Sequence, residues 1–96
     1  MLGFRFSPGR VVATPGALAL LRSAGASAEG LLLRHLRLEP GQLDLHDQQA
    51  NQSALTSGAR IFSAFDVGGE LLWIITEAKG DDGRRASTCF LLPSEY

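Results

Sequence analysis

The chain has 96 residues, with nine Lys and Arg against ten Asp and Glu, eleven Gly, four Pro and 45% apolar residues. This composition is too apolar and too nearly neutral for a disordered chain. The length is too short for two ordinary domains, so we expect a single domain over residues 1–96. The formal net charge of −1 argues against a generic nucleic-acid binder, which carries a basic excess, and against an acidic DNA mimic.

The chain begins with an irregular segment followed by a first helix. Residues 4–13 contain a Pro-Gly turn signal, and we expect either two very short strands or an extended arm. Thr14 can cap a helix, and Pro15 suits the first helical position because it has no amide hydrogen to leave unpaired. Apolar residues recur at three- and four-residue spacing up to Gly25, a plausible end for this helix.

Two further helices are predicted between Ser27 and Gly58. Ser27 restarts the helical pattern, which continues until the Pro-Gly pair at Pro40. A third helix is expected over about 45–57, with Asp44 accepting bonds from its free amides and Gly58 ending it. This third segment is polar except for a narrow apolar stripe, so it should lie on the surface.

The period of the apolar residues changes from helical to strand-like after residue 59. Strands are expected over 60–66, 70–77 and 86–92, with a glycine hairpin turn at 67–69 and a charged loop at 79–85. The resulting fold class is α+β: two to three short N-terminal helices packed on a C-terminal three-stranded antiparallel meander. The strand that contains Trp73 should lie at the centre of this meander.

The central strand is apolar on both of its sides. Leu71, Trp73 and Ile75 point one way, and Leu72 and Ile74 point the other. A strand of this kind needs cover on both faces, and one layer of helices covers only one. The other face is covered either by residues 1–24 or by another chain, which makes a homodimer or protein partner on the sheet face a hypothesis equal to internal cover.

The single cysteine, Cys89, rules out an intrachain disulfide and fits a reducing compartment. It lies in an apolar strand-like run, and we interpret it as a small buried hydrophobic residue rather than a reactive thiol. No apolar run approaches the roughly 20 residues needed to cross a membrane, and residues 1–6 lack the apolar core of a signal peptide. We therefore expect a cytoplasmic protein without a membrane partner.

The sequence contains no recognisable metal or cofactor motif. His35, Asp44, His46 and Asp47 match no known ligand spacing, so neither a metal nor a cofactor is expected. Phosphate-binding loops and dinucleotide fingerprints are absent, and no serine sits in a nucleophile elbow.

A better candidate patch combines Asp47, Asn51, Arg60, Thr76 and Glu77. The first two share a helix face, and the hairpin register brings the other three to one end of the sheet. An Arg/Glu/Thr group of this kind resembles the sites of small ribonucleases, in which Glu acts as base and Arg stabilises phosphate charge. The more ordinary interpretation, which we favour, is an Arg60–Glu77 ion pair and a hydrogen-bonded latch between the third helix and the sheet.

The loop over residues 79–85 carries the main basic cluster. Lys79, Arg84 and Arg85 offer positive charge to a phosphate, and Asp81 and Asp82 cancel much of it. A solubilising loop is the stronger interpretation, and nucleic-acid binding through these residues is a weaker one.

Several runs of the sequence carry a resemblance to a family. They are Val12-Ala13-Thr14-Pro15-Gly16-Ala17-Leu18, Asn51-x-x-Ala54-Leu55-x-x-Gly58-x-Arg60-Ile61-x-Ser63-x-Phe65, Leu72-Trp73-Ile74-Ile75-Thr76-Glu77-Ala78, then Thr88 and Leu91-Leu92-Pro93-x-Glu95-Tyr96. The chain resembles small bacterial proteins that are carried on plasmids and integrative elements and labelled plasmid-related proteins. It departs from them in the loop at 79–85, which is longer and more charged. The resemblance implies a context of defence, counter-defence, maintenance or regulation and names no chemistry.

Together these observations favour a non-enzymatic interaction protein of mobile-genetic-element type that binds another protein. The expected binding residues are Asp47, Asn51, Arg60, Trp73, Arg84 and Arg85. The alternative is a small toxin-like ribonuclease that uses Arg60 and Glu77, with Thr76 beside them.

Overall fold

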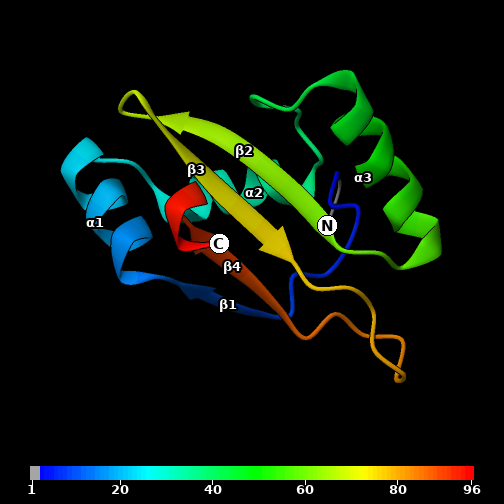
Figure 1. Ribbon diagram of the computed structural model, residues 1–96. Helices are drawn as coiled ribbons and strands as arrows, with labels where there is room; N and C mark the ends of the chain where they lie inside the picture. Colours follow the sequence, from blue (N-terminus) through cyan, green and yellow to red (C-terminus); the bar gives the residue numbers. More distant parts are fainter. Residues whose placement is uncertain (1–2) are drawn as a thin grey trace.

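The structure is a computed structural model that describes residues 3–96; Met1 and Leu2, which belong to the expected single domain, lie outside the described residues. In chain order the elements are β1 (Arg10–Ala13), α1 (Pro15–Ala24), α2 (Ala28–Leu36), α3 (Leu45–Ser57), β2 (Ile61–Val67), β3 (Glu70–Thr76), β4 (Ser87–Leu91) and the short 3₁₀ turn η1 (Pro93–Glu95). The expected α+β class is confirmed. Figure 1 shows α2 behind the sheet, α1 and α3 to its two sides, and the C-terminal turn in front.

The sheet has four strands in the order β1-β4-β3-β2. Its β2-β3-β4 part is the expected antiparallel meander, with the Trp73 strand inside the sheet. The prediction of a three-stranded sheet is wrong, because β1 pairs in parallel with β4 from Arg10↔Ser87 to Ala13↔Phe90. This pairing joins segments almost eighty residues apart, so no local sequence pattern reports it.

The helix ends follow the signals in the sequence. Thr14, Ser27 and Asp44 each accept a hydrogen bond from the backbone N–H three residues further on, which satisfies one of the free donors at a helix start. Gly25 and Gly58 end α1 and α3 with φ of 62° and 81°, a region in which glycine has no Cβ to clash. The second helix stops at its Leu36, earlier than expected.

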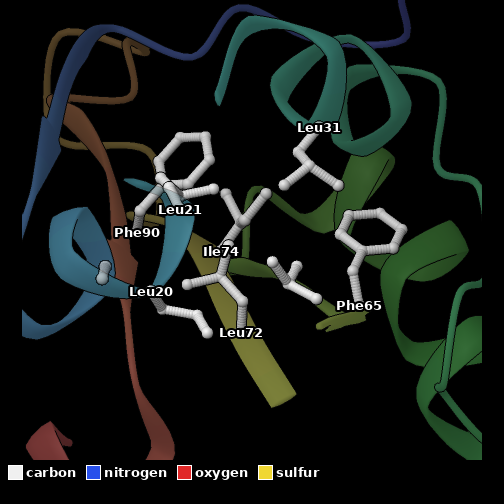
Figure 2. Close-up of a cluster of buried hydrophobic side chains, with 9 residues drawn as sticks. Leu20, Leu21, Leu31, Phe65, Leu72, Ile74 and Phe90 are labelled. Carbon is white, nitrogen blue, oxygen red and sulfur yellow. The ribbon is translucent and has the colours of Figure 1, made fainter. Parts of the chain in front are cut away.

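The main core lies between the sheet and the first two helices. Leu72 and Ile74 of β3 are fully buried, and Figure 2 shows Leu20, Leu21 and Leu31 gathered around them. Phe65 and Phe90 close the same cluster from the neighbouring strands (Figure 2). Burial removes the apolar area of each of these side chains from water, which contributes roughly 1.5–3 kcal/mol per side chain to the stability of the fold.

The second face of the sheet has much less cover, and of the two alternatives left open by the sequence, cover by residues 1–24 is not what the described residues show. The α1 side chains Leu20 and Leu21 pack with Leu72, so α1 shares the face that α2 covers. On the opposite face the described residues provide the C-terminal turn, where Tyr96 meets Trp73 edge to face at 5.7 Å, and Asp47 and Arg60 at the margin. We call this second side the open face.

Candidate binding sites

The open face is built from alternate residues of all four strands. Strand pairing places one apolar side chain from each strand in a single row, which consists of Val12, Cys89, Ile75 and Phe62. The next row holds Leu91, Trp73 and Ala64, and Leu71 lies beyond it.

Exposure is uneven across this surface. Val12 and Leu71 are 39% and 45% exposed, and Phe62, Trp73 and Cys89 are half-buried. The remaining side chains of this face, Ile75, Leu91 and Ala64, are buried between them. Phe62 and Trp73 meet edge to face with their ring centres 5.1 Å apart, an arrangement that aromatic pairs favour. The open face is therefore a continuous apolar surface around a fixed aromatic pair.

The C-terminal turn is fixed over part of the open face by Glu95. Its carboxylate accepts hydrogen bonds from the Thr14 hydroxyl at 2.6 Å, Leu92 N–H at 2.8 Å and Gly16 N–H at 3.2 Å. The Thr14 bond above all holds the pKa of Glu95 below its usual range, because these donors favour the charged form. Tyr96 follows directly and lies against the tryptophan, so the turn forms one margin of the open face.

Cys89 sits in the middle of the open face. Burial raises the pKa of its thiol, and the charges of Glu95 and Glu77 raise it further. A raised pKa keeps the sulfur protonated and weakly nucleophilic, which agrees with the interpretation of an unreactive thiol. The side chain is half-buried rather than buried as expected.

The candidate patch of five residues does not come together as one site. The register Ile61↔Thr76 agrees with the expected hairpin. Successive strand residues point to opposite faces, however, so Thr76 is fully buried on the helix side while Glu77 is exposed on the other. The ribonuclease-like grouping therefore lacks its Thr76.

Asn51 forms the latch that the sequence suggested. Its amide donates to the Phe62 carbonyl oxygen at 2.6 Å and accepts from the Phe62 N–H at 3.0 Å. The Phe62 carbonyl and N–H lie on the side of the edge strand β2 that faces away from β3. The next carbonyl on this side, that of Ala64, accepts a hydrogen bond from the Gln42 N–H. The edge of β2 is thus closed by side chain and loop, which prevents another strand from adding there.

Arg60 contacts an aromatic ring rather than a carboxylate. Its guanidinium lies 5.2 Å from the centre of the Tyr96 ring, and neither ion pair found within residues 3–96 joins it to Glu77. A small hollow of about 300 Å³ opens beside it, lined by Asp47, Arg60, Phe62, Trp73, Ile75 and Tyr96. Two of the predicted patch residues, Asp47 and Arg60, therefore meet the tryptophan at the margin of the open face.

A buried polar chain runs beneath the sheet, and sequence reasoning missed it. The His35 ring is fully buried, with Nδ1 2.6 Å from the Ser63 hydroxyl and Nε2 2.8 Å from the Thr76 hydroxyl. Thr76 in turn lies 2.6 Å from the Thr88 hydroxyl, which donates to the Pro8 carbonyl at 2.7 Å.

The order of donors in this chain assigns the tautomer of His35. Thr88 uses its only proton on the carbonyl, so it accepts from Thr76, and Thr76 must then accept from the Nε2–H of the ring. Burial lowers the pKa of His35 to about 4, so the ring is neutral near pH 7 and its Nδ1 accepts from Ser63. Every hydroxyl and ring nitrogen of the chain is satisfied.

The serine–histidine contact has the hydrogen-bond pattern of an activated nucleophile, but it is sealed. Ser63 and His35 are both 0% exposed, and Phe6 covers the ring edge to face at 5.2 Å. We interpret this buried hydrogen-bonded network around His35 as structural. The one signal available in the sequence was the position of His35 four residues after Leu31, on the buried stripe of its helix.

The acidic start of α3 brings three potential metal ligands together. Ligand atoms of Asp44, His46 and Asp47 lie within 4.8 Å of one another, and His35 is far from them in the core. Asp44 is already the helix cap, accepting from the Asp47 N–H at 2.8 Å. All three side chains are exposed or half-buried, an arrangement common at surface helix starts.

A larger cavity lies between the N-terminal arm and the loop that joins β3 to β4. It has a volume of about 610 Å³ and is lined by Arg5, Phe6, Ser7, Gly9, Leu55, Lys79, Gly83, Arg84 and Arg85. The loop residues Lys79, Arg84 and Arg85, which the sequence suggested as a basic cluster, are therefore brought together with Arg5 from the N-terminal arm. We call this site the basic cavity.

Among residues 3–96, no helix is both long and apolar enough to cross a membrane. No family model, curated protein or solved structure matches the chain.

Proposed function

We propose that the chain is a non-enzymatic interaction protein that holds a protein partner on its open face, of the mobile-genetic-element type that its resemblance to plasmid-related proteins implies. The observation that carries the proposal is the apolar row across all four strands, from Val12 to Phe62, on the side of the sheet that the helices leave uncovered. An exposed apolar surface of this kind is typical of a contact site.

The residues around the open face support a protein partner. Trp73, Tyr96 and Arg60 are of the residue types enriched at the energetic centres of protein interfaces, and here Tyr96 contacts both of the others. Asp47 and Glu95 add negative charge at the same margin, so a partner would meet both signs around an apolar centre. A rim of this composition excludes water without requiring a highly charged partner.

The alternative, catalysis by Arg60 and Glu77, has less support. The two histidine–hydroxyl pairs within hydrogen-bond distance in the described chain, His35 with Ser63 and His35 with Thr76, are fully buried. A ribonuclease would require Arg60 to be aimed at phosphate, whereas its guanidinium stacks over Tyr96. RNA cleavage by the purified protein, lost in both Arg60→Ala and Glu77→Ala, would establish the alternative.

The test uses two leucines of equal exposure on different sides of the molecule. Leu71 on the open face is 45% exposed and Leu18 on α1 is 46% exposed. Leu71→Asp and Leu18→Asp therefore make the same chemical change at matched sites. Each variant and the parent protein is first analysed by size-exclusion chromatography with light scattering, which reports whether a second copy is the partner.

If the parent is monomeric, a partner is captured from the native host, purified and titrated against the three proteins. The proposal predicts that Leu71→Asp weakens the complex at least about tenfold, since burying a charge against an apolar surface costs well over 1.4 kcal/mol. Leu18→Asp should bind as the parent does. Equal affinity of the two variants would contradict the open face as the binding surface.

A further inference from the structure

The basic cavity joins three parts of the chain that are distant in sequence. The N-terminal arm contributes Arg5, the end of α3 contributes Leu55, and the loop between β3 and β4 contributes Lys79, Arg84 and Arg85. Four cationic side chains line one cavity, and none of the residues that line it is acidic. In a chain whose formal net charge is −1, this is a strong local separation of charge.

The acidic residues of the same loop do not line the cavity. The Asp82 carboxylate is turned to the backbone, where it accepts from the Arg84 N–H at 2.9 Å, and neither it nor Asp81 lines the cavity. The two ion pairs of the described chain, Arg34–Glu39 and His46–Asp47, lie elsewhere.

Arg85 places a fixed positive charge in the wall of the cavity. Its guanidinium donates to the carbonyl oxygens of Ala59 at 2.6 Å, Glu77 at 3.0 Å and Ala54 at 3.0 Å, and the side chain is only 7% exposed. These acceptors are neutral carbonyls, and the guanidinium also lies over the Phe6 ring, 5.8 Å from its centre, so the charge has partners but no carboxylate. Its Nε–H has no hydrogen-bond acceptor at all.

A buried guanidinium without a counter-charge is unfavourable, and an anion in the adjoining cavity would offset that cost. The wall is also held rigidly, because the backbone of the arm approaches the loop closely. A Cβ on Gly9 would lie 2.3 Å from the Arg85 carbonyl oxygen, and Gly9 adopts a φ of 65°. A fixed cationic wall of this kind is suited to binding an anion without reorganisation.

We propose that the basic cavity binds a nucleoside polyphosphate. Lys79, Arg84 and Arg5 are exposed at the cavity and supply the charge-assisted contacts to phosphate oxygens, while Arg85 contributes its buried charge from behind. Phe6 and Leu55 are the apolar lining residues against which a base would lie. The volume of about 610 Å³ falls within the range of small-molecule sites.

A compact nucleotide fits these observations better than a long nucleic acid. A polynucleotide contacts charge along an extended stripe, and its affinity depends on a basic surface. Here the charge is concentrated within one concavity, and Asp81 and Asp82 on the exposed loop would repel a continuing backbone.

The test is isothermal titration of the full chain with ATP, ADP, inorganic phosphate, adenosine and a single-stranded RNA oligonucleotide. The proposal predicts that ATP binds more tightly than ADP, ADP more tightly than phosphate, and that adenosine shows no binding. Lys79→Gln with Arg84→Gln should weaken ATP binding at least about tenfold, because two charge-assisted contacts are lost. Arg85 is left intact because its bonds hold the end of α3.

The matched control is Arg10→Gln with Arg22→Gln, which removes the same two charges from exposed positions outside the cavity. It should bind ATP as the parent does. Equal loss in both double variants, or no ATP binding at millimolar concentration, would overturn the proposal. RNA binding that is tighter than ATP binding and falls steeply with salt would also overturn it, in favour of a nucleic-acid site.

This inference is independent of the protein-binding proposal. The double variant Lys79→Gln with Arg84→Gln should keep the open-face partner, because neither residue lies on that surface.

Discussion

The buried His35 should make the stability of the protein fall as the pH is lowered through the range of an ordinary histidine. Burial lowers its pKa from 6.5 to about 4, so between these values the unfolded chain binds a proton that the folded chain does not. Above pH 6.5 both states hold a neutral ring, and this contribution to stability is fully present.

The size of the effect follows from the two pKa values. Relative to neutral pH, the free energy of unfolding should be lower by about 2 kcal/mol at pH 5 and by about 3 kcal/mol at pH 4. Carboxylates titrate over part of the same range, so the histidine term must be measured as a difference. His35→Gln serves this purpose, because glutamine can donate to Thr76 and accept from Ser63 and stays neutral at every pH.

The assay is urea unfolding followed by the fluorescence of Trp73, the only tryptophan, at several values between about pH 4 and pH 7.5. The difference in stability between parent and His35→Gln should shrink as the pH falls. His46→Gln removes the other histidine, whose side chain is 89% exposed, and should follow the parent. Parallel curves for the parent and His35→Gln would refute a buried neutral histidine.

Three further changes test the packing. Asn51→Ala removes both hydrogen bonds to the edge strand and should lower the free energy of unfolding in urea by about 2 kcal/mol. The exposed control Gln52→Ala should lower it by only a few tenths of a kcal/mol, and similar losses in the two variants would contradict the latch. Gly41→Ala should lower the free energy of unfolding by about 2 kcal/mol more than Gly83→Ala. Both glycines have a positive φ, but only at Gly41 would a Cβ lie 2.4 Å from a strand carbonyl oxygen, so equal melting temperatures of the two variants would contradict this packing. Glu95→Gln should loosen the C-terminal turn and shift the tryptophan emission to longer wavelength. Acidification of the parent protein through the lowered pKa of Glu95 should have the same effect, and an unchanged spectrum would show that the Glu95 carboxylate does not hold the turn.

Elements set by nearby residues were predictable from the sequence. The helix caps, the glycine turn and the meander register depend on residues a few positions apart, and they were predicted within a few residues of the observed bounds. The strand β1 was not, because its four residues gain their pairing only from β4 at the far end of the chain.

The candidate site was predictable only in part. The Asn51 latch followed from helix spacing and strand register, and the position of Thr76 could have been assigned by strand alternation, which separates it from Glu77. The basic cavity needed the arm, the loop and the end of α3 to meet, so the sequence showed the three loop cations without Arg5.

Nor could the buried chain of His35 have been found by spacing alone. Its hydroxyls come from β2, β3 and β4, on alternate positions that look like ordinary strand polar residues. Only the three-dimensional arrangement shows that they satisfy one another, which is how a polar group can be buried at low cost.

The most direct test of the open face uses the single cysteine as a reporter. Cys89 lies in the apolar row, and the chain contains no other thiol. The measurement is the alkylation rate of Cys89 by a maleimide, without the purified partner and with it at the lowest concentration that saturates the parent protein. We predict that the partner protects Cys89 in the parent and in Leu18→Asp but not in Leu71→Asp; an alkylation rate unchanged by a bound partner would contradict the account.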